Sequence, residues 1–338
     1  MIYNKCMDTG RIFGIDSPGA FEECALEIFH YQYRFCVQYR RYCDLMEVSP
    51  GSIRSMAEIP FLPIRFFKQY DIISSAEPSA VPQKIFLSSS TTGQTPSRHC
   101  VLDTGLYERS FLGGFRHFYG SPESYVILAL LPSYLEREGS SLVYMAERLI
   151  KESGHPESGY YLYDYDRLYS TLAALKERGQ KTLLLGVAFG LLDFLDSYSL
   201  QGSGNDRWLT VMETGGMKGR REELSREELH RRISAGFGIS SVHSEYGMCE
   251  LLSQAYSKGD GVFRTPAWMK VIIRDINDPF RESAPGERGI VHIMDLANVF
   301  SCSFIETEDT GRAWPDGTFT VEGRLDGAER RGCNMLIE

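Results

Sequence analysis

Short apolar runs alternate with helix-forming stretches three times in the middle of the chain. The runs are "YVILALLP" (125–132), "KTLLLGVAF" (181–189) and "RWLTVMETGG" (207–216). Strands that are apolar along their whole length occur in parallel sheets that helices cover on both faces. The alternation therefore predicts an α/β fold with parallel sheets flanked by helices, in which ligands bind at the carboxyl ends of the strands.

Helices are predicted from local patterns elsewhere. Residues 20–46 carry apolar and aromatic side chains at spacings of three and four, which predicts one long helix. Residues 225–238 open with Ser225 and Glu228, the pair that forms a capping box. A further helix is expected to begin near Met248, directly after a strand in "SSVHSEYG" (240–247).

After residue 262 the pattern changes to strands separated by Gly, Pro and Asp turns. The segments are "WMKVIIRDI" (268–276), "RGIVHIMDL" (288–296), "SCSFIETED" (301–309) and "GTFTVEGRLD" (317–326). Strands that follow one another at such short intervals pair with their neighbours through tight turns. We therefore expect an antiparallel or barrel-like part at the C-terminal end of the fold.

Composition excludes several classes of protein. The net charge of −9 is the wrong sign for a general nucleic-acid binder, which needs a basic surface. The eight cysteines include no CxxC pair, so their spacing supports neither a zinc nor a redox site. The N-terminus has no apolar signal core, and no apolar run approaches the roughly 20 residues of a membrane span. These features predict a reduced, soluble, cytoplasmic protein without an integral membrane segment.

Residues 87–98, "LSSSTTGQTPSR", are the first segment with the residue types of a binding site. Hydroxyl side chains lead into Gly93 directly after an apolar run. Hydroxyls and closely approaching backbone N–H groups can cradle phosphate oxygens, and glycine permits the close approach. The same composition also fits a flexible Ser/Thr loop. A Walker loop is excluded, because the chain contains no GxxxxGK[ST].

Two further segments place carboxylates near strand ends. In "SSVHSEYGMCELLSQ" (240–254), Glu250 could bind Mg²⁺, which takes one or two protein carboxylates together with phosphate oxygens, and Tyr246 could stack on a base. Glu250 could equally be a glutamate that the dipole of a helix start favours. In residues 304–332, Asp309 could bind a ribose diol and Arg324 a phosphate, although Asp and Gly there also fit ordinary turns.

Taken in order, these three segments resemble the motifs of the adenylate-forming superfamily of acyl-CoA synthetases, luciferases and nonribosomal-peptide adenylation domains. The closer resemblance is to the LuxE family, the acyl-protein synthetases of bacterial bioluminescence operons. It extends over roughly residues 60–338, and four segments carry it: "LLPSYLEREGSSLVYMAERLI" (130–150), "ETGGMKGRREELSREELH" (213–230), "SEYGMCELLSQAYS" (244–257) and "DLANVFSCSFIETEDTG" (295–311).

The resemblance implies an acid–thiol ligase that uses ATP and Mg²⁺ to convert a carboxylic acid, a fatty acid in LuxE, into an acyl-adenylate. It implies a role for each matching residue. ATP phosphates would contact Ser89, Ser90, Thr91, Thr92 and Gly93; adenine would contact Thr214, Gly215, Gly216 and Tyr246; Mg²⁺ would bind Glu250; ribose would bind Asp309; and the hinge motif would supply Arg324 and Asp326. Residues 183–195 could line an acyl tunnel or simply form core.

The chain departs from the superfamily pattern at several positions. Ser90 and Ser97 stand where glycine and lysine are usual, with Arg98 as a possible substitute for the lysine, and Cys249 replaces a phosphate-contacting threonine. The sequence ends twelve residues after Asp326 and has no lysine after Lys270, whereas superfamily members continue into a mobile lid with a catalytic lysine. The expected fold therefore lacks the C-terminal lid domain.

Cys333 offers an alternative to the lid. In the LuxE family a cysteine near the C-terminus accepts the acyl group as a thioester, and a partner reductase then reduces it. Neighbouring Arg330 and Arg331 would lower the pKa of the Cys333 thiol and favour the attacking thiolate. The same residue could also be an ordinary surface cysteine in a frayed tail.

We expect three parts of the chain: a helical N-terminal region packed on the core (1–80), an adenylate-forming core (81–325) and a hinge remnant and tail with Cys333 (326–338). We expect acyl-adenylate formation and acyl transfer to Cys333, for delivery to an acyl-thioester reductase. The alternatives are a CoA or carrier-protein ligase of the phenylacetate-CoA-ligase type and a non-catalytic nucleotide-binding subunit.

Overall fold

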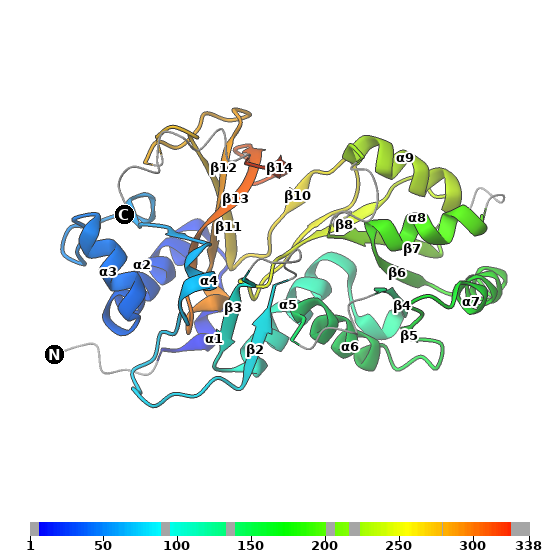
Figure 1. Ribbon diagram of the computed structural model, residues 1–338, viewed down its shortest axis with the longest axis horizontal. Helices are drawn as coiled ribbons and strands as arrows, with labels where there is room; N and C mark the ends of the chain where they lie inside the picture. The colour runs from blue at the N-terminus through cyan, green and yellow to red at the C-terminus, as the bar shows by residue number, and fades with distance from the viewer. Residues whose placement is uncertain are drawn as a thin grey trace. The chain divides into compact units, whose positions relative to one another are not determined.

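The computed structural model describes residues 7–88, 95–132, 139–200, 207–215, 224–278 and 280–325. These residues form two compact units. Figure 1 draws the chain with colours that run from blue at the N-terminus to red at the C-terminus. Unit 1 takes its described residues from 1–110, 249–253 and 264–338, and unit 2 takes its own from 111–248 and 254–263. Each unit therefore joins stretches that are far apart in the sequence.

A parallel sheet forms the centre of unit 2. Its strands lie in the order β5 (Gly159–Tyr160), β4 (Val126–Leu130), β6 (Thr182–Val187), β7 (Leu209–Thr214) and β8 (His243–Tyr246), and β9 (Ala255–Ser257) pairs with β8 antiparallel. Every residue of β4 and β6 is buried. The prediction of fully apolar, parallel strands is therefore confirmed.

Helices lie on both faces of this sheet. They are α6 (Ser141–Ser153), α7 (Tyr165–Glu177), α8 (Ala188–Ser197) and α9 (Arg226–Phe237), with the short η2 (Pro122–Ser124) before β4, while α5 (Thr104–Tyr119) enters unit 2 at Phe111. Figure 1 shows α6 on one side of the strands and α8 and α9 on the other. This follows from right-handed crossovers, because the chain moves one way from β4 to β5 and the opposite way from β6 to β8.

Unit 1 contains an antiparallel sheet, which confirms the prediction for the C-terminal part. In it β11 (Met269–Arg274), β12 (Gly289–Asp295), β13 (Phe304–Ala313) and β14 (Phe319–Arg324) pair in chain order, and β1 (Leu62–Pro63) runs parallel to β13. A separate ribbon consists of β2 (Lys84–Leu87) and β3 (Arg98–Val101). The short β10 (Phe263–Arg264) lies where unit 2 ends and unit 1 resumes.

Short and long helices near the N-terminus complete unit 1. They are α1 (Thr9–Ile12), α2 (Pro18–Phe35), α3 (Val37–Leu45), η1 (Met56–Glu58) and α4 (Phe66–Gln69), with η3 (Leu296–Asn298) after β12. Tyr39 of α3 stacks on Phe304 of β13 with ring centroids 6.1 Å apart, and its hydroxyl donates to the Pro60 carbonyl at 2.7 Å. Aromatic side chains thus attach these helices to the antiparallel sheet.

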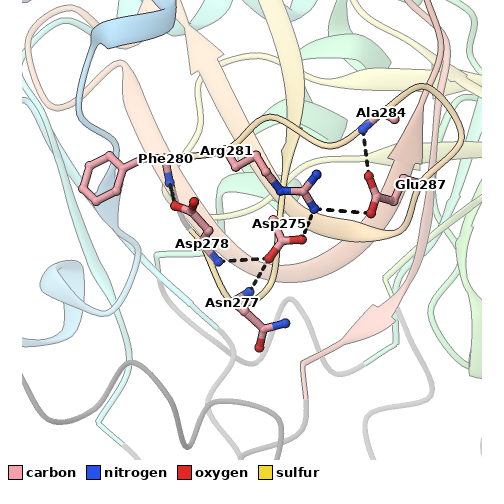
Figure 2. A network of polar contacts seen from close by, with 7 residues as sticks. All are labelled: Asp275, Asn277, Asp278, Phe280, Arg281, Ala284 and Glu287. Carbon is pink, nitrogen blue, oxygen red and sulfur yellow. Dashed lines mark hydrogen bonds and ion pairs between the residues drawn. The ribbon is translucent and has the colours of Figure 1, made fainter.

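The turn between β11 and β12 is braced by charged side chains (Figure 2). The carboxylate of Asp275 accepts from the backbone N–H groups of Asn277 and Asp278, at 2.7 and 3.0 Å. Arg281 donates to the carboxylates of Asp275 and Glu287. These bonds add to backbone pairing that continues beyond the strands, where Asp275 N–H donates to the Arg281 carbonyl at 2.9 Å.

Two helix predictions are wrong in detail. The helix expected over 20–46 breaks at Cys36, whose backbone is extended and whose side chain is buried. The break lets α3 change direction so that Tyr39 meets Phe304, a tertiary contact that periodicity does not report.

The cap on α9 forms, with Ser225 Oγ accepting from Glu228 N–H at 3.2 Å, but the Glu228 carboxylate pairs with arginines instead of closing a capping box.

The helix expected near Met248 does not form. Strand β8 ends at Tyr246, and the residues up to the start of β9 at Ala255 are irregular. Side chains from β12 and η3 bond to the backbone groups that a helix would use itself. Glu250 therefore does not lie at a helix N-terminus. Across the described ranges, no helix combines the length and the apolarity needed to cross a membrane.

Candidate active site

Glu250 lies in the irregular segment Cys249–Ser253, which belongs to unit 1. Side chains hold this segment in place of a helical ladder. The Asp295 carboxylate accepts from the backbone N–H of Leu252 at 2.8 Å and of Ser253 at 2.9 Å. Trp268 donates through its indole N–H to the Ser253 hydroxyl at 3.0 Å. The segment is thereby fixed although it has no regular secondary structure.

The carboxyl group of Glu250 is buried, since the residue is 4% exposed. Burial raises its pKa above the usual range, and a hydrogen bond with the Ser97 side chain together with the charges of Arg324 and Lys68 acts in the opposite direction. A buried carboxylate is costly unless a cation or a donor compensates it. Glu250 therefore has the electrostatic surroundings of a group that gains from a bound cation.

Asp309 and Arg324 face each other across paired strands. They are register partners on β13 and β14, and Arg324 Nε lies 3.7 Å from Asp309 Oδ1. The Asp309 side chain is 16% exposed, whereas that of Arg324 is 82% exposed. Of the predicted site residues, unit 1 thus brings Glu250, Asp309 and Arg324 into one electrostatic neighbourhood.

The predicted adenine-binding residues that the structure describes lie in unit 2. Gly215 follows β7 with a φ of +66°, a conformation that favours glycine. Tyr246 ends the neighbouring strand β8, and its ring lies 5.9 Å from that of Phe263. Both residues are therefore at the carboxyl ends of adjacent parallel strands, where ligands of α/β folds bind.

A buried acid precedes Tyr246 on β8, opposite Thr214 of β7. Glu245 accepts a hydrogen bond from the Thr214 hydroxyl, and burial raises its pKa to about 7. Gly247 leaves room for this carboxyl group, because a Cβ there would lie 2.4 Å from Glu245 Oε1. Sequence reasoning did not single out Glu245, although a charged residue inside a buried strand is an observable signal.

Several predicted residues lie outside the described part of the chain: Ser89, Ser90, Thr91, Thr92, Gly93, Gly216, Asp326 and Cys333. The described residues on either side of positions 89–94 bond to each other. Ser88 N–H donates to the Ser97 carbonyl at 3.1 Å, and Ser97 N–H donates to the Ser88 hydroxyl at 2.8 Å. The ends of strands β2 and β3 that flank these positions are thus tied together.

The departures from the superfamily pattern have structural counterparts. Ser97, which stands where lysine is usual, is 2% exposed and bonds to Glu250. Arg98, the possible substitute for that lysine, forms an ion pair with Asp71, with 3.1 Å between its Nε and Asp71 Oδ1. The Cys249 thiol is buried, and burial raises its pKa well above the usual value, so it stays neutral. Ser97 therefore contributes to the site although sequence reasoning treated it only as a missing charge.

The structure also has a polar pair that sequence reasoning missed. His99 on β3 and Asn298 on η3 are both buried and bond to the backbone around Glu250. Their signal in the sequence is polar residues within the apolar contexts "RHCV" and "LANVF".

The described residues contain no cluster of three or more His, Cys, Asp or Glu side chains suited to holding a metal by themselves. A single buried carboxylate fits Mg²⁺ under one condition, which is that nucleotide phosphates and water supply the other oxygen ligands. Glu250 therefore suits a metal that arrives with a nucleotide and not a permanent protein-bound ion.

Comparison with solved structures identifies the fold. ATP-bound MatB from Rhodopseudomonas palustris matches with a TM-score of 0.52 and 16% identity, over 74% of this chain and 50% of that one. An open conformation of 2-hydroxyisobutyryl-CoA ligase, in complex with 2-HIB-AMP and CoA, matches with a TM-score of 0.63 and 15% identity, over 91% of this chain and 70% of that one. The mixed α/β fold is that of the adenylate-forming ligases.

The structural matches differ from this chain in length, and comparisons of sequence found no match. The chain spans about half the length of the first of these structures, MatB and its chimeras. No protein-family model matches the chain, and no curated protein matches it in sequence.

Proposed function

We propose that the protein activates a carboxylic acid with ATP. A carboxylate oxygen attacks the α-phosphorus, the bond between the α-phosphorus and the bridging oxygen of pyrophosphate breaks, and acyl-adenylate and pyrophosphate result. The nucleophile is already ionised at neutral pH, so the protein has mainly to position the reactants and neutralise charge. The observation that carries the proposal is the grouping of Glu250, Asp309 and Arg324 within an adenylate-forming ligase fold.

The predicted site residues have separate roles in this proposal. Glu250 binds Mg²⁺, which supplies charge neutralisation at the phosphates. Asp309 accepts hydrogen bonds from the ribose hydroxyls, and Arg324, whose side chain is largely exposed, contacts phosphate. Tyr246 and Gly215 bound the adenine at the strand ends. The hydroxyl side chains at 89–92 and Gly93 hold the phosphates.

The second step proposed is acyl transfer to a thiol, as in the LuxE family. The thiolate attacks the acyl carbonyl carbon, AMP leaves, and a thioester forms. The six cysteines within the described residues are all buried, so none of those six is an accessible acceptor. We place the acceptor at Cys333, from which a partner reductase would take the acyl group.

One alternative is supported by a specific observation. The 2-hydroxyisobutyryl-CoA ligase was solved with CoA bound, so a fold of this kind can deliver its acyl group to a free thiol. In that case the acceptor is CoA or a carrier-protein thiol and Cys333 is not acylated. A non-catalytic, nucleotide-binding role is the remaining alternative, motivated by Ser90, Ser97 and Cys249.

Carboxylate-dependent exchange of pyrophosphate into ATP tests the first step. Across a panel of aliphatic and aromatic acids, we expect exchange with at least one acid. Glu250→Gln should lower the exchange rate roughly 100-fold or more, because it removes the charge opposite Mg²⁺. Glu228→Gln, on α9 of unit 2, is the matched control and should leave the rate unchanged. Exchange in Glu250→Gln at the wild-type rate would contradict the metal role.

Labelled acid and ATP test the second step. The wild-type protein should retain a hydroxylamine-sensitive label, Cys333→Ser should lose it, and Cys6→Ser should keep it. Label retained in Cys333→Ser would exclude that cysteine as the acceptor. Thioester formation on added CoA that is independent of Cys333 would favour the alternative.

A further inference from the structure

We propose that His99 and Asn298 are positioning residues that set the metal affinity of Glu250 by holding two consecutive backbone carbonyls, those of Cys249 and Glu250. The proposal rests on the assignment of Glu250 to Mg²⁺ in the proposed function. Neither residue touches the carboxyl group itself through the bonds described below. Both act on the backbone that carries it.

The bonds are short and all lie within unit 1. His99 Nδ1 is 2.8 Å from the Cys249 carbonyl oxygen. Asn298 Nδ2 donates to the Glu250 carbonyl at 2.8 Å and to the Cys302 carbonyl at 2.9 Å. The two donors at Asn298 fix the orientation of its amide, since a flipped amide would set an oxygen against two carbonyl oxygens.

Helix α2 fixes the position of Asn298 through hydrogen bonds to the backbone of η3 and the residue after it. Gln32 donates through Nε2 to the carbonyl of Asn298 at 3.2 Å and of Val299 at 2.9 Å, and its Oε1 accepts from Ser303 N–H at 3.0 Å. Gln32 is fully buried, as are His99 and Asn298. The position of η3, and with it the Asn298 amide, is therefore fixed independently of the Cys249–Ser253 segment.

The proposal requires the proton of His99 to be on one particular ring nitrogen. Burial lowers the pKa of the ring to about 4, so a neutral ring with one N–H is present at neutral pH. Nε2 faces Asn298 Oδ1 at 3.0 Å, and Nδ1 faces the Cys249 oxygen at the shorter distance of 2.8 Å. Both facing atoms are acceptors, so a neutral ring can donate to only one of them. The proposal places the N–H on Nδ1, at the shorter contact, as the donor to the backbone of the metal-binding segment.

These bonds matter because the segment has no helical ladder to fix its backbone. Mg²⁺ requires near-ideal octahedral geometry, so a carboxylate on a loose backbone binds it poorly. Partners that orient a metal ligand without touching the metal change affinity or activity by roughly 10–100-fold when they are lost. His99 and Asn298 take this part for Glu250.

A pair of variants separates positioning from general stability. In His99→Asn the amide nitrogen can occupy the place of Nδ1 and still donate to the Cys249 carbonyl. In His99→Gln the amide nitrogen takes the place of Nε2, and that carbonyl loses its donor. Mn²⁺ binding is measured by electron paramagnetic resonance with α,β-methylene-ATP. We expect His99→Gln to weaken Mn²⁺ binding roughly 10–100-fold and His99→Asn to stay near the wild type.

Nitrogen-15 chemical shifts of the wild-type His99 ring provide a measurement that needs no variant. The proposal predicts a protonated Nδ1 and an unprotonated Nε2. The opposite tautomer would overturn it, and so would equal Mn²⁺ affinities in the two variants. The experiments also remain informative if no acid supports pyrophosphate exchange. In that case the proposed acid activation is contradicted, while Mn²⁺ binding still decides the role of His99. Absence of Mn²⁺–nucleotide binding by the wild type overturns both the proposed function and the positioning role of His99.

Discussion

The fold keeps the carboxyl group of Glu245 protonated up to a pH of about 7. Its pKa rises from 4.5 to about 7, mainly because burial disfavours the charged form. Between these two values the unfolded chain has released the proton and the folded chain retains it. Folding stability therefore falls as the pH rises through this window, and a difference of this size corresponds to about 3 kcal/mol.

Glu245→Gln should remove this pH dependence. The amide keeps the shape of the neutral acid and cannot ionise, so the variant should become more stable than the wild type at pH 8, by up to about 3 kcal/mol. Urea unfolding between pH 5 and 8 measures the effect. Glu228→Gln should keep the wild-type slope, because Arg231 and Arg232 lower the pKa of Glu228 and keep it ionised across this range. A slope in Glu245→Gln equal to that of the wild type would mean that Glu245 is ionised in the fold.

At the level of single elements, β13 and β14 carry Asp309 and Arg324 and depend on a close approach at Gly311. The register of the pair shifts between Thr310 and Gly311. A Cβ at Gly311 would lie 2.0 Å from the Thr320 carbonyl oxygen and 3.2 Å from a Val291 methyl group. The glycine therefore lets the two strands that carry the proposed nucleotide ligands come together.

Gly311→Ala should lower the free energy of unfolding by about 1–3 kcal/mol or more, because the added Cβ clashes with backbone and no rotamer change can relieve the clash. Urea unfolding is the measurement. Gly159→Ala on β5 is the matched control, since nothing lies within 4 Å of a Cβ there. Equal stability of the two variants would contradict the account of this strand pair.

The elements also show the reach of sequence patterns. Apolar runs predicted the strands β4, β6 and β7, because burial on both faces leaves a direct mark on composition, and the helices α6, α8 and α9 that follow them were expected too. Strand β5 and helix α7, which lie between β4 and β6, were not predicted. The break at Cys36 and the irregular segment after Tyr246 were not predictable from local patterns. Both follow from contacts with residues more than 40 positions away, such as Tyr39 with Phe304 and Leu252 with Asp295.

At the level of the whole molecule, each unit is assembled from separated stretches of chain. Unit 1 gathers α2, the segment around Glu250 and the strands β11 to β14, and Gln32 bonds to the backbone of Asn298 and Val299. Motif order singled out Glu250, Asp309 and Arg324, which unit 1 brings into one electrostatic neighbourhood. It could not predict His99 and Asn298, because they support the site through buried contacts with its backbone and lie in no motif.

The central claim is that a carboxylate of the substrate attacks the α-phosphorus of ATP. It is tested most directly with an acid labelled with ¹⁸O in its carboxylate and with hydroxylamine as the acyl acceptor. The account predicts AMP that carries one ¹⁸O atom, unlabelled pyrophosphate and an acyl hydroxamate, all measured by mass spectrometry. Label in inorganic phosphate, or AMP without label, would contradict it.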